Sequence, residues 1–201
     1  MKLLISGASP YARKVRIVAG MKGLDDRIDL IEPDSDSYAV LRAQNPLGKI
    51  PILILDDGAA LYDSHVICEY LDAQVASPVL FPGEGLKRWQ MLTHAAIGDG
   101  ILDAALLVVY EHRYRPGGMQ VQNWLDMQQA KIGAAVAQLE AAPPVWQGGP
   151  DYSHITIAAA LGYLDLRQDG AWRDGNPKLV SWLEAFRKAV PAFDKTAPPA
   201  C

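Results

Sequence analysis

The stretch NPLGKIPILILDDGAALYDSHVI, residues 45–67, decides the fold of the first half of the chain. Within it, two apolar runs, Pro51–Leu55 and Ala59–Tyr62, flank the pair Asp57-Gly58. An Asp-Gly pair between two such runs favours a two-residue turn, so the sequence predicts a β-hairpin. Asp63 and Ser64 follow at once, and both residue types cap helix N-termini. We therefore expect a helix after the hairpin, with an apolar face formed by Val66, Ile67, Tyr70 and Leu71.

Upstream of this stretch, two short apolar runs flank one helical pattern. Leu3–Ile5 and Ile28–Ile31 have the length of short strands. Between them, Tyr11–Met21 carries apolar residues three or four positions apart, a spacing that predicts a helix. Lys22-Gly23 marks the end of this helix. The order is strand, helix, strand, a connecting segment, then the hairpin and its helix. This order predicts a small α/β unit.

The pattern changes near residue 78. Proline and glycine gather in residues 76–83, which is typical of a linker. Beyond them no strand pattern recurs, and apolar residues keep a helical period in four segments. These segments run from Leu86 to about Val109, over Val121–Leu139, from about Ser153 to Arg167, and over Pro177–Ala189. We expect an α/β domain over residues 1–77, a linker over 78–84 and an all-α domain over 85–201.

Composition excludes several classes of function. The 201 residues carry 19 basic and 23 acidic side chains, so the chain lacks the cationic excess that nucleic-acid binding requires. Cys68 and Cys201 are too few and too far apart for a disulfide framework, and the chain has no Cys-x-x-Cys pair. Its apolar runs are shorter than the roughly 20 residues that span a bilayer, and no secretory signal is visible. We expect a cytoplasmic protein with no membrane or nucleic-acid partner.

Three local motifs predict a binding site for a small anion or zwitterion. Ser9 precedes Pro10 at the start of a helix, where a hydroxyl and bare backbone N–H groups favour a thiolate or carboxylate. If the Ile50–Pro51 bond is cis, the N–H and C=O of Ile50 face outward and can hold another backbone. Asp63 and Ser64 suit an ammonium and a carboxylate. Taken singly, each motif is also consistent with an ordinary cap or a loop that enters an edge strand.

In their order and spacing these motifs resemble those of cytosolic glutathione transferases of the bacterial, serine-type group that begins Ser-Pro-Phe/Tyr-x-Arg-Lys. The matching stretches are SPYARK at residues 9–14, NPLGKIP at 45–51, Asp63-Ser64, and ALGYLD at 160–165. The resemblance covers essentially the whole chain. It implies an α/β, thioredoxin-like N-terminal domain followed by an all-α helical domain.

The resemblance also implies a role for each matching residue. Ser9 corresponds to the hydroxyl that donates a hydrogen bond to the sulfur of glutathione and favours the nucleophilic thiolate. Ile50-Pro51 corresponds to the backbone that holds the cysteinyl part of glutathione. Asp63 and Ser64 correspond to the site for its γ-glutamyl end, and Lys49 is expected near its glycyl carboxylate.

The function implied is that of a homodimeric glutathione transferase in detoxification. Glutathione is the co-substrate, no metal is required, and the thiolate attacks a small, hydrophobic electrophile. Glutathione-dependent isomerisation, dehalogenation and peroxide reduction stay open, because serine-type members do all of these. A transferase-like protein that binds partners without catalysis is a further alternative.

We expect the electrophile between the two domains. Tyr11, Tyr110 and Tyr114 could line its pocket, and the last two are one turn apart on one helix. Aromatic packing between the domains is the alternative for these three residues. Asp99 and Asp103 share a face of the same helix and could face either a partner subunit or water.

One departure from the family concerns the helix near residue 153. The family's helix usually starts Ser/Thr-x-x-Asp, a capping box. Here Ser153 is followed at the fourth position by Thr156, which offers no charge to the helix dipole. The sequence therefore predicts a weaker cap at Ser153. Of the two cysteines, Cys68 is expected to be buried and Cys201 to lie in a tail.

Overall fold

The computed structural model describes residues 1–33 and 38–199, so Cys201 and its expected tail position lie outside the described residues. The chain forms two compact units. The N-terminal unit contains residues 1–83 and the chain from Val190 onward, and the helical unit contains Glu84–Ala189. The sequence pattern predicts a single helical domain over residues 85–201. The structure differs in the last segment, which packs within the N-terminal unit.

A four-stranded sheet in the order β2-β1-β3-β4 forms the centre of the N-terminal unit. β1 (Lys2–Leu4) pairs in parallel with β2 (Asp29–Ile31) and antiparallel with β3 (Ile52–Ile54). β3 pairs antiparallel with β4 (Ala60–Leu61) across the expected hairpin. The prediction of an α/β domain followed by helices is confirmed.

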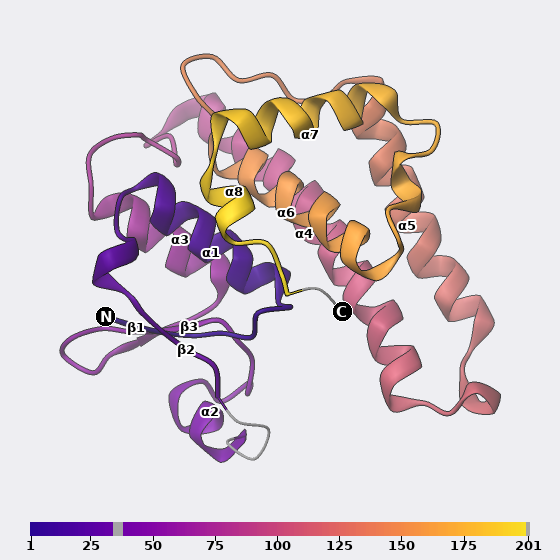
Figure 1. Cartoon of the computed structure of the whole chain (residues 1–201), viewed down its shortest axis with the longest axis horizontal. Helices are drawn as coiled ribbons and strands as arrows, with labels where there is room; N and C mark the ends of the chain where they lie inside the picture. The colour runs from indigo at the N-terminus through magenta and orange to yellow at the C-terminus, as the bar shows by residue number, and fades with distance from the viewer. Residues whose placement is uncertain (34–37, 200–201) are drawn as a thin grey trace. The chain divides into compact units, whose positions relative to one another are not determined.

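Helices lie on both sides of this sheet (Figure 1). α1 (Pro10–Met21) and α3 (Ser64–Ala73) lie on one side, and α2 (Tyr38–Gln44) lies on the other. The sequence pattern predicts only a connecting segment where α2 forms, and it gives no signal for the short 3-10 helix η1 (Asp25–Arg27). The apolar positions that predicted α1, Val15, Val18 and Ala19, are buried in the structure. Cys68 of α3 is buried as expected.

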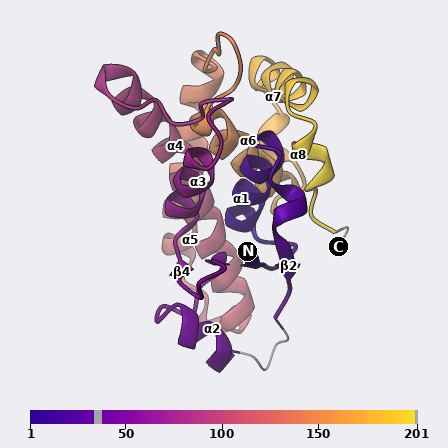
Figure 2. The ribbon, with the colours of Figure 1, turned by 90° about the vertical axis from the view of Figure 1, so that its left-hand side faces the viewer.

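A short C-terminal helix, α8 (Ala192–Lys195), packs on α1 (Figure 2). Arg13 Nη2 donates a hydrogen bond of 2.9 Å to the carbonyl of Phe193, and Arg13 Cζ lies 3.9 Å from the Phe193 ring centroid. A Cβ added to Gly20 would lie 2.8 Å from the Cβ of Ala192. These contacts place α8 in the N-terminal unit.

A buried ion pair joins the ends of α1 and α3 to the segment that follows α3. Lys22 Nζ, on a fully buried side chain, lies 2.8 Å from Asp72 Oδ1 and donates to the Pro78 carbonyl at 2.6 Å. Asp72 also accepts hydrogen bonds from the backbone N–H groups of Leu80 and Phe81, at 3.0 Å each. Buried charges are retained in proteins when they are paired and hydrogen-bonded in this way.

The helical unit consists of four long helices and two short 3-10 helices. They are α4 (Gly85–Tyr114), η2 (Gly117–Met119), α5 (Gln122–Ala141), α6 (Tyr152–Arg167), η3 (Ala171–Arg173) and α7 (Pro177–Ala189). α6 packs against both α4 and α7, and every residue from Tyr152 to Leu164 is buried. α6 is therefore the core of this unit (Figure 1).

The close approach of α4 to α6 depends on Gly98. A Cβ at this position would lie 2.8 Å from the carbonyl carbon of Thr156 and 2.9 Å from the backbone nitrogen of Ile157. Backbone atoms of a packed helix move aside less readily than the end of a side chain. A residue without a side chain is therefore required where the two helices meet.

α4 is also long and apolar. Within the described ranges it is the single helix that could cross a membrane by length and composition, with a mean hydropathy of 1.6 over 18 residues. The core helix of a soluble protein passes the same test, and 39% of this window is buried in the protein. Its packing against α5 and α6 supplies an ordinary reason for its apolar composition.

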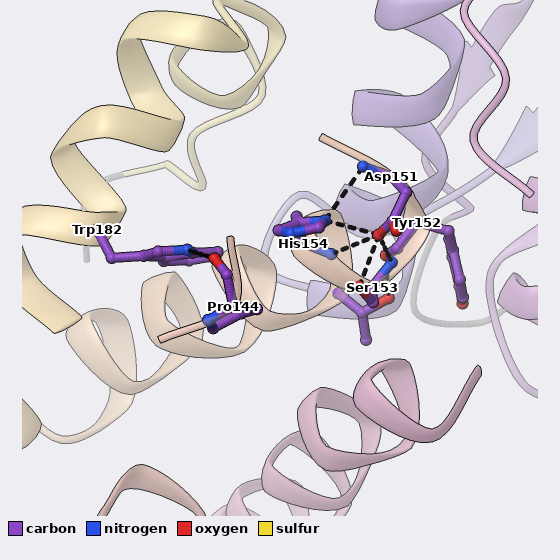
Figure 3. Close-up of polar contacts among 7 residues, drawn as sticks. Pro144, Asp151, Tyr152, Ser153, His154 and Trp182 are labelled. Atoms are coloured by element: carbon purple, nitrogen blue, oxygen red, sulfur yellow. Dashed lines mark hydrogen bonds and ion pairs between the residues drawn. The ribbon is translucent and has the colours of Figure 1, made fainter. Parts of the chain in front are cut away.

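The cap of α6 differs from the expected one. The capping residue is Asp151, two positions before Ser153, and the helix begins at Tyr152 (Figure 3). Asp151 Oδ1 accepts hydrogen bonds from the Ser153 N–H at 2.9 Å and the Ser153 hydroxyl at 2.6 Å. Thr156 lies a turn into the helix, where its hydroxyl donates to the carbonyl of Tyr152. The prediction of a weaker cap at Ser153 was wrong, because a carboxylate already occupies the capping position.

His154 completes this cap as the fourth residue of a capping box. Its Nδ1 lies 2.6 Å from Asp151 Oδ1 and 3.1 Å from the Asp151 backbone nitrogen. The ring stacks on Trp182, with centroids 6.2 Å apart, and meets the Trp146 ring edge-on at 5.3 Å. Burial acts to raise the pKa of Asp151, but the hydrogen bonds from His154 and Ser153 outweigh it and hold that pKa below its ordinary value. The cap is thus a charged one.

Candidate functional site

The sheet register brings the three predicted motifs to one end of the N-terminal unit. Leu4, at the end of β1, lies opposite Ile52 at the start of β3. Leu61, at the end of β4, lies opposite Leu53. The chain therefore leaves β1, enters β3 and leaves β4 at the same edge. Three groups of residues therefore lie at this edge: Ser9, which follows β1, the residues just before β3, and those just after β4.

Ser9 is the N-cap of α1, as the sequence predicted. Its Oγ accepts a hydrogen bond from the Ala12 N–H at 3.2 Å, and Pro10 occupies the first helical position. A hydroxyl that accepts one bond still carries a proton it can donate. Ser9 is half-buried, so a ligand can reach this proton. Its use in catalysis stays a prediction.

The segment before β3 has the geometry that the sequence analysis considered. The Ile50–Pro51 peptide bond is cis. Asn45 shapes the loop, because its Nδ2 donates to the carbonyl of Lys49 at 2.9 Å and its Oδ1 accepts from the Leu47 N–H at 3.0 Å. β3 begins at Ile52, so the N–H and C=O of Ile50 lie outside the strand ladder.

Asp63 is the N-cap of α3. Its Oδ1 accepts hydrogen bonds from the backbone N–H groups of His65 at 2.9 Å and Val66 at 3.4 Å. The carboxylate is exposed, whereas Ser64 beside it is buried. The peptide bond before Asp63 is also cis, although residue 63 is not a proline, and no sequence signal indicated it.

Two helix N-termini meet the same edge of the sheet, since α1 starts after β1 and α3 starts after β4. Each presents the partial positive end of its helix dipole at this edge. Neither helix has an acidic residue in its first turn. The edge is therefore suited to an anionic ligand.

The remaining predicted site residues lie in both units. Lys49 is exposed in the loop before β3. Tyr11 is half-buried on α1, where the Lys14 ammonium lies 5.4 Å from its ring centroid. Tyr110 and Tyr114 of α4 form an edge-to-face pair with centroids 5.3 Å apart. Both are exposed. The shared pocket expected from these three tyrosines stays a prediction.

The carboxylates that the sequence singled out are in different surroundings. Asp99 is half-buried on α4 and Asp103 is exposed, and each interacts with other groups of the protein. Within residues 1–33 and 38–199, no three His, Cys, Asp or Glu side chains are grouped as a metal site.

Comparisons with known proteins agree on one family. The family described as glutathione S-transferase, N-terminal domain, matches residues 8–74. An uncharacterized GST-like protein of Escherichia coli K12, YibF, is 32% identical over 203 residues and 99% of both chains. Maleylacetoacetate isomerase of Pseudomonas aeruginosa PAO1 is 31% identical over 146 residues, 69% of both chains.

Solved structures of a glutathione transferase family member from Pseudomonas fluorescens Pf-5 are similar along the whole chain. The one with bound glutathione has a TM-score of 0.90 and 41% identity, with 99% of both chains covered. The one with bound S-(propanoic acid)-glutathione has a TM-score of 0.87 and 40% identity, with full coverage of both chains.

Proposed function

The chain belongs to the glutathione S-transferase family, and from this premise we propose that it binds glutathione at the sheet edge and activates its thiol for transfer to a small electrophile. The observation that carries the proposal is the convergence of Ser9, Ile50-Pro51 and Asp63 on one edge of the sheet, beside two helix N-termini. These groups match the parts of glutathione: a thiolate, a peptide backbone and a γ-glutamyl zwitterion.

Ser9 is the proposed catalytic residue, and it makes the protein a serine-type member of the family. A thiol with a pKa of about 8.5 is mostly protonated at pH 7, whereas the thiolate is the nucleophile. Lowering that pKa by about two units requires roughly 2.7 kcal/mol of preferential interaction with the thiolate. One hydroxyl donor and the N-terminus of α1 together supply energy of that size.

The other residues of the edge hold glutathione in place. The N–H and C=O of Ile50 bind the cysteinyl backbone beside Pro51. Asp63 pairs with the γ-glutamyl ammonium, and the Ser64 hydroxyl, at the positive end of the α3 dipole, binds the adjoining carboxylate. Lys49 is exposed close by in sequence and approaches the glycyl carboxylate. The protein is a cytoplasmic detoxification enzyme in this proposal, and glutathione is its co-substrate.

The relatives support transfer and also one alternative. The Pseudomonas fluorescens relative binds a thioether of glutathione, which is the kind of product that thiolate attack forms. The similarity to maleylacetoacetate isomerase favours glutathione-dependent isomerisation as a second candidate function. Both reactions use the same activated thiolate.

Substitution of Ser9 tests the proposal. Ser9→Ala should raise the thiol pKa of bound glutathione and lower turnover of a model electrophile at neutral pH, and the loss should shrink as pH rises because the thiol then ionises unaided. Ultraviolet titration of the bound thiolate and a pH–rate profile measure both effects. Ser6→Ala is the matched control, because Ser6 precedes α1 but does not cap it. Unchanged activity and thiol pKa in Ser9→Ala would reduce Ser9 to a helix cap.

A further inference from the structure

A small cavity lies in the N-terminal unit, where α1 packs beside the edge strand β2. Its volume is about 150 Å³, and α1, η1, β1, β2 and the end of α8 all contribute to its wall (Figure 2). These elements belong to one compact unit. Neither Ser9 nor Asp63 is among the described residues that line it. We call it the β2 cavity, and it is separate from the sheet edge proposed for glutathione.

The floor of the β2 cavity is apolar. It is formed by Leu3, Ala19, Ile28 and Leu30. The first three are buried, whereas Leu30 is 50% exposed, so the cavity opens to water beside β2. An apolar cavity of about 150 Å³ holds a molecule of the size of benzene. The floor therefore suits an apolar group of roughly four to six carbon atoms.

Three charged side chains from three elements line the same cavity: Arg16 of α1, Asp25 of η1 and Lys195 of α8. Within residues 1–33 and 38–199, none of them takes part in an ion pair. The Asp25 carboxylate therefore lies more than 4.0 Å from both cationic groups, although all three share so small a space. Opposite charges that line one cavity without contact leave room for a ligand that carries both signs.

The carboxylate of Asp25 lies beside the start of α8. A Cβ added to Gly20 of α1 would lie 3.4 Å from Asp25 Oδ1 and 3.5 Å from Oδ2. The same Cβ would lie 2.8 Å from the Cβ of Ala192, the first residue of α8. The carboxylate and the first residue of α8 therefore meet α1 at the same position.

Both cations are displaced from this carboxylate in one direction. A Cβ on Gly7, in the turn before α1, would lie 3.2 Å from Pro199 Cδ, so the chain after the start of α8 runs back along α1 toward the N-terminus of that helix. Lys195, the last residue of α8, lies in this direction. Arg16 lies one helical turn before Gly20 in the same direction, roughly 5–6 Å along α1. The β2 cavity thus carries its negative charge at one end and its positive charges toward the other.

We propose that the β2 cavity binds a free apolar α-amino acid. The ammonium of this ligand pairs with Asp25, its carboxylate pairs with Arg16 and Lys195, and its side chain packs on the apolar floor. Asp25 repels a simple carboxylate and the two cations repel a simple amine, whereas a zwitterion pairs with both kinds of charge. The inference goes beyond the proposed function and does not depend on it, because no residue of the proposed glutathione site takes part.

Three probes with the same apolar body separate these contacts. They are L-leucine, 4-methylpentanoate, which lacks the ammonium, and 3-methylbutylamine, which lacks the carboxylate. Titrated into the whole protein at pH 7 without glutathione and followed by ligand-observed NMR, leucine should bind about tenfold more tightly than either analogue, the usual effect of one charge-assisted contact. This comparison needs no variant, so misfolding cannot affect it. Leucine that binds no more tightly than either analogue would overturn the inference.

Two charge variants test the assigned groups, and the analogues check that each variant is folded. Arg16→Gln should weaken binding of leucine about tenfold and bind 3-methylbutylamine no more weakly than the wild type does. Asp25→Asn should weaken leucine by about the same factor and bind 4-methylpentanoate no more weakly than the wild type does. A variant that keeps its analogue has an intact cavity. Unchanged affinity for leucine in both variants would contradict the assignment.

Asp26→Asn and Arg27→Gln are the matched controls. Both side chains are exposed, and neither is among the described residues that line the β2 cavity. Each control should change the affinity for leucine by less than about twofold, because exposed charges interact weakly through water. Losses in the controls as large as those in Arg16→Gln and Asp25→Asn would show a general effect of charge and overturn the inference.

Leucine also shares an ammonium and a carboxylate with the γ-glutamyl end of glutathione, so the two sites must be told apart. Saturating glutathione and the variant Asp63→Asn should each leave the binding of leucine unchanged. Displacement of leucine by glutathione would overturn the inference and support the proposed function. Binding of leucine that depends on Arg16 and Asp25, in a protein that does not bind glutathione, would support the inference and count against the proposed function.

Discussion

At the scale of a residue, Asp63 has one role in the fold and a second, proposed role in binding. Its Oδ1 caps α3 through two backbone N–H groups, while the charge of the carboxylate is the proposed partner of the glutathione ammonium. Asparagine caps helices about as well as aspartate does. Asp63→Asn therefore removes the charge and keeps the cap, which separates the two roles.

We expect Asp63→Asn to weaken glutathione binding about tenfold, because a hydrogen bond to a charged group contributes ~1.5–3 kcal/mol. Its thermal stability should stay close to that of the wild type. Calorimetry with glutathione, and with an analogue that lacks the γ-glutamyl amino group, measures the effect. Both proteins should bind the analogue equally. Equal affinity for glutathione itself would leave Asp63 as a cap alone.

At the scale of an element, the packing of α4 on α6 predicts opposite effects for two glycines of the same helix. Gly98→Ala should destabilise the protein by about 1–3 kcal/mol, because the new Cβ meets the backbone of α6. Gly100→Ala should stabilise it by roughly 0.5–1 kcal/mol, because nothing lies within 4 Å of its Cβ and alanine favours a helix. Chemical unfolding of both variants measures the difference. Effects of the same sign and size would contradict the close approach of α4 and α6.

The charged cap of α6 predicts a dependence of stability on pH. The pKa of Asp151 is lowered in the folded protein, so its charge stabilises the fold above the unfolded value of about 3.9, and this stabilisation is lost as pH falls through the folded value. Asp151→Asn keeps a capping oxygen that does not titrate. It should be about 1 kcal/mol less stable than the wild type at pH 6, with the gap closing toward pH 3.

Urea unfolding across this pH range tests the cap, with Asp174→Asn as the control because Asp174 is exposed and follows η3, where its backbone N–H, rather than its carboxylate, makes the cap hydrogen bond. The control should differ from the wild type by a constant amount at every pH. A gap for Asp151→Asn that stays constant down to pH 3 would show that the charge of Asp151 contributes nothing to the cap.

At the scale of the whole molecule, we expect a two-fold symmetric homodimer, as the family resemblance implies. Large apolar side chains are exposed on α4 and α5, among them Leu86, Trp89 and Trp124, and exposed apolar surface favours association. Light scattering at micromolar concentration should give twice the chain mass of 21.9 kDa. Trp89→Glu should reduce this mass, whereas Val145→Glu, at another exposed apolar position, should not. A monomeric wild type would contradict the prediction.

Local patterns predicted most of the elements because their signals are short-range. The Asp57-Gly58 turn, the caps at Ser9 and Asp63 and the helical periods all depend on residues within a few positions of one another. The cap of α6 was misplaced by two residues because Asp151 and Ser153 are both good capping residues, and the structure uses Asp151. α2 was missed because a helix of seven residues carries little periodic signal.

The candidate site was predictable only in part, for a related reason. The cap at Ser9 follows from residue types, and the structure shows it. For Ile50–Pro51 the sequence only allowed a cis bond, which the structure shows. The cis bond before Asp63 does not follow from residue types, because residue 63 is not a proline.

The return of the chain to α1 through α8 makes the helical unit an insertion within the N-terminal unit. A hybrid protein that takes its N-terminal unit from a relative therefore needs two junctions, one near Gly83 and one near Val190. A single junction near Gly83 would set a foreign α1 against the native α8, where Arg13 must match Phe193 and a glycine must meet Ala192. Recombination at both junctions exchanges the N-terminal unit as a whole. Recombination at one junction alone separates residues 1–83 from the segment that begins at Val190 and packs with them.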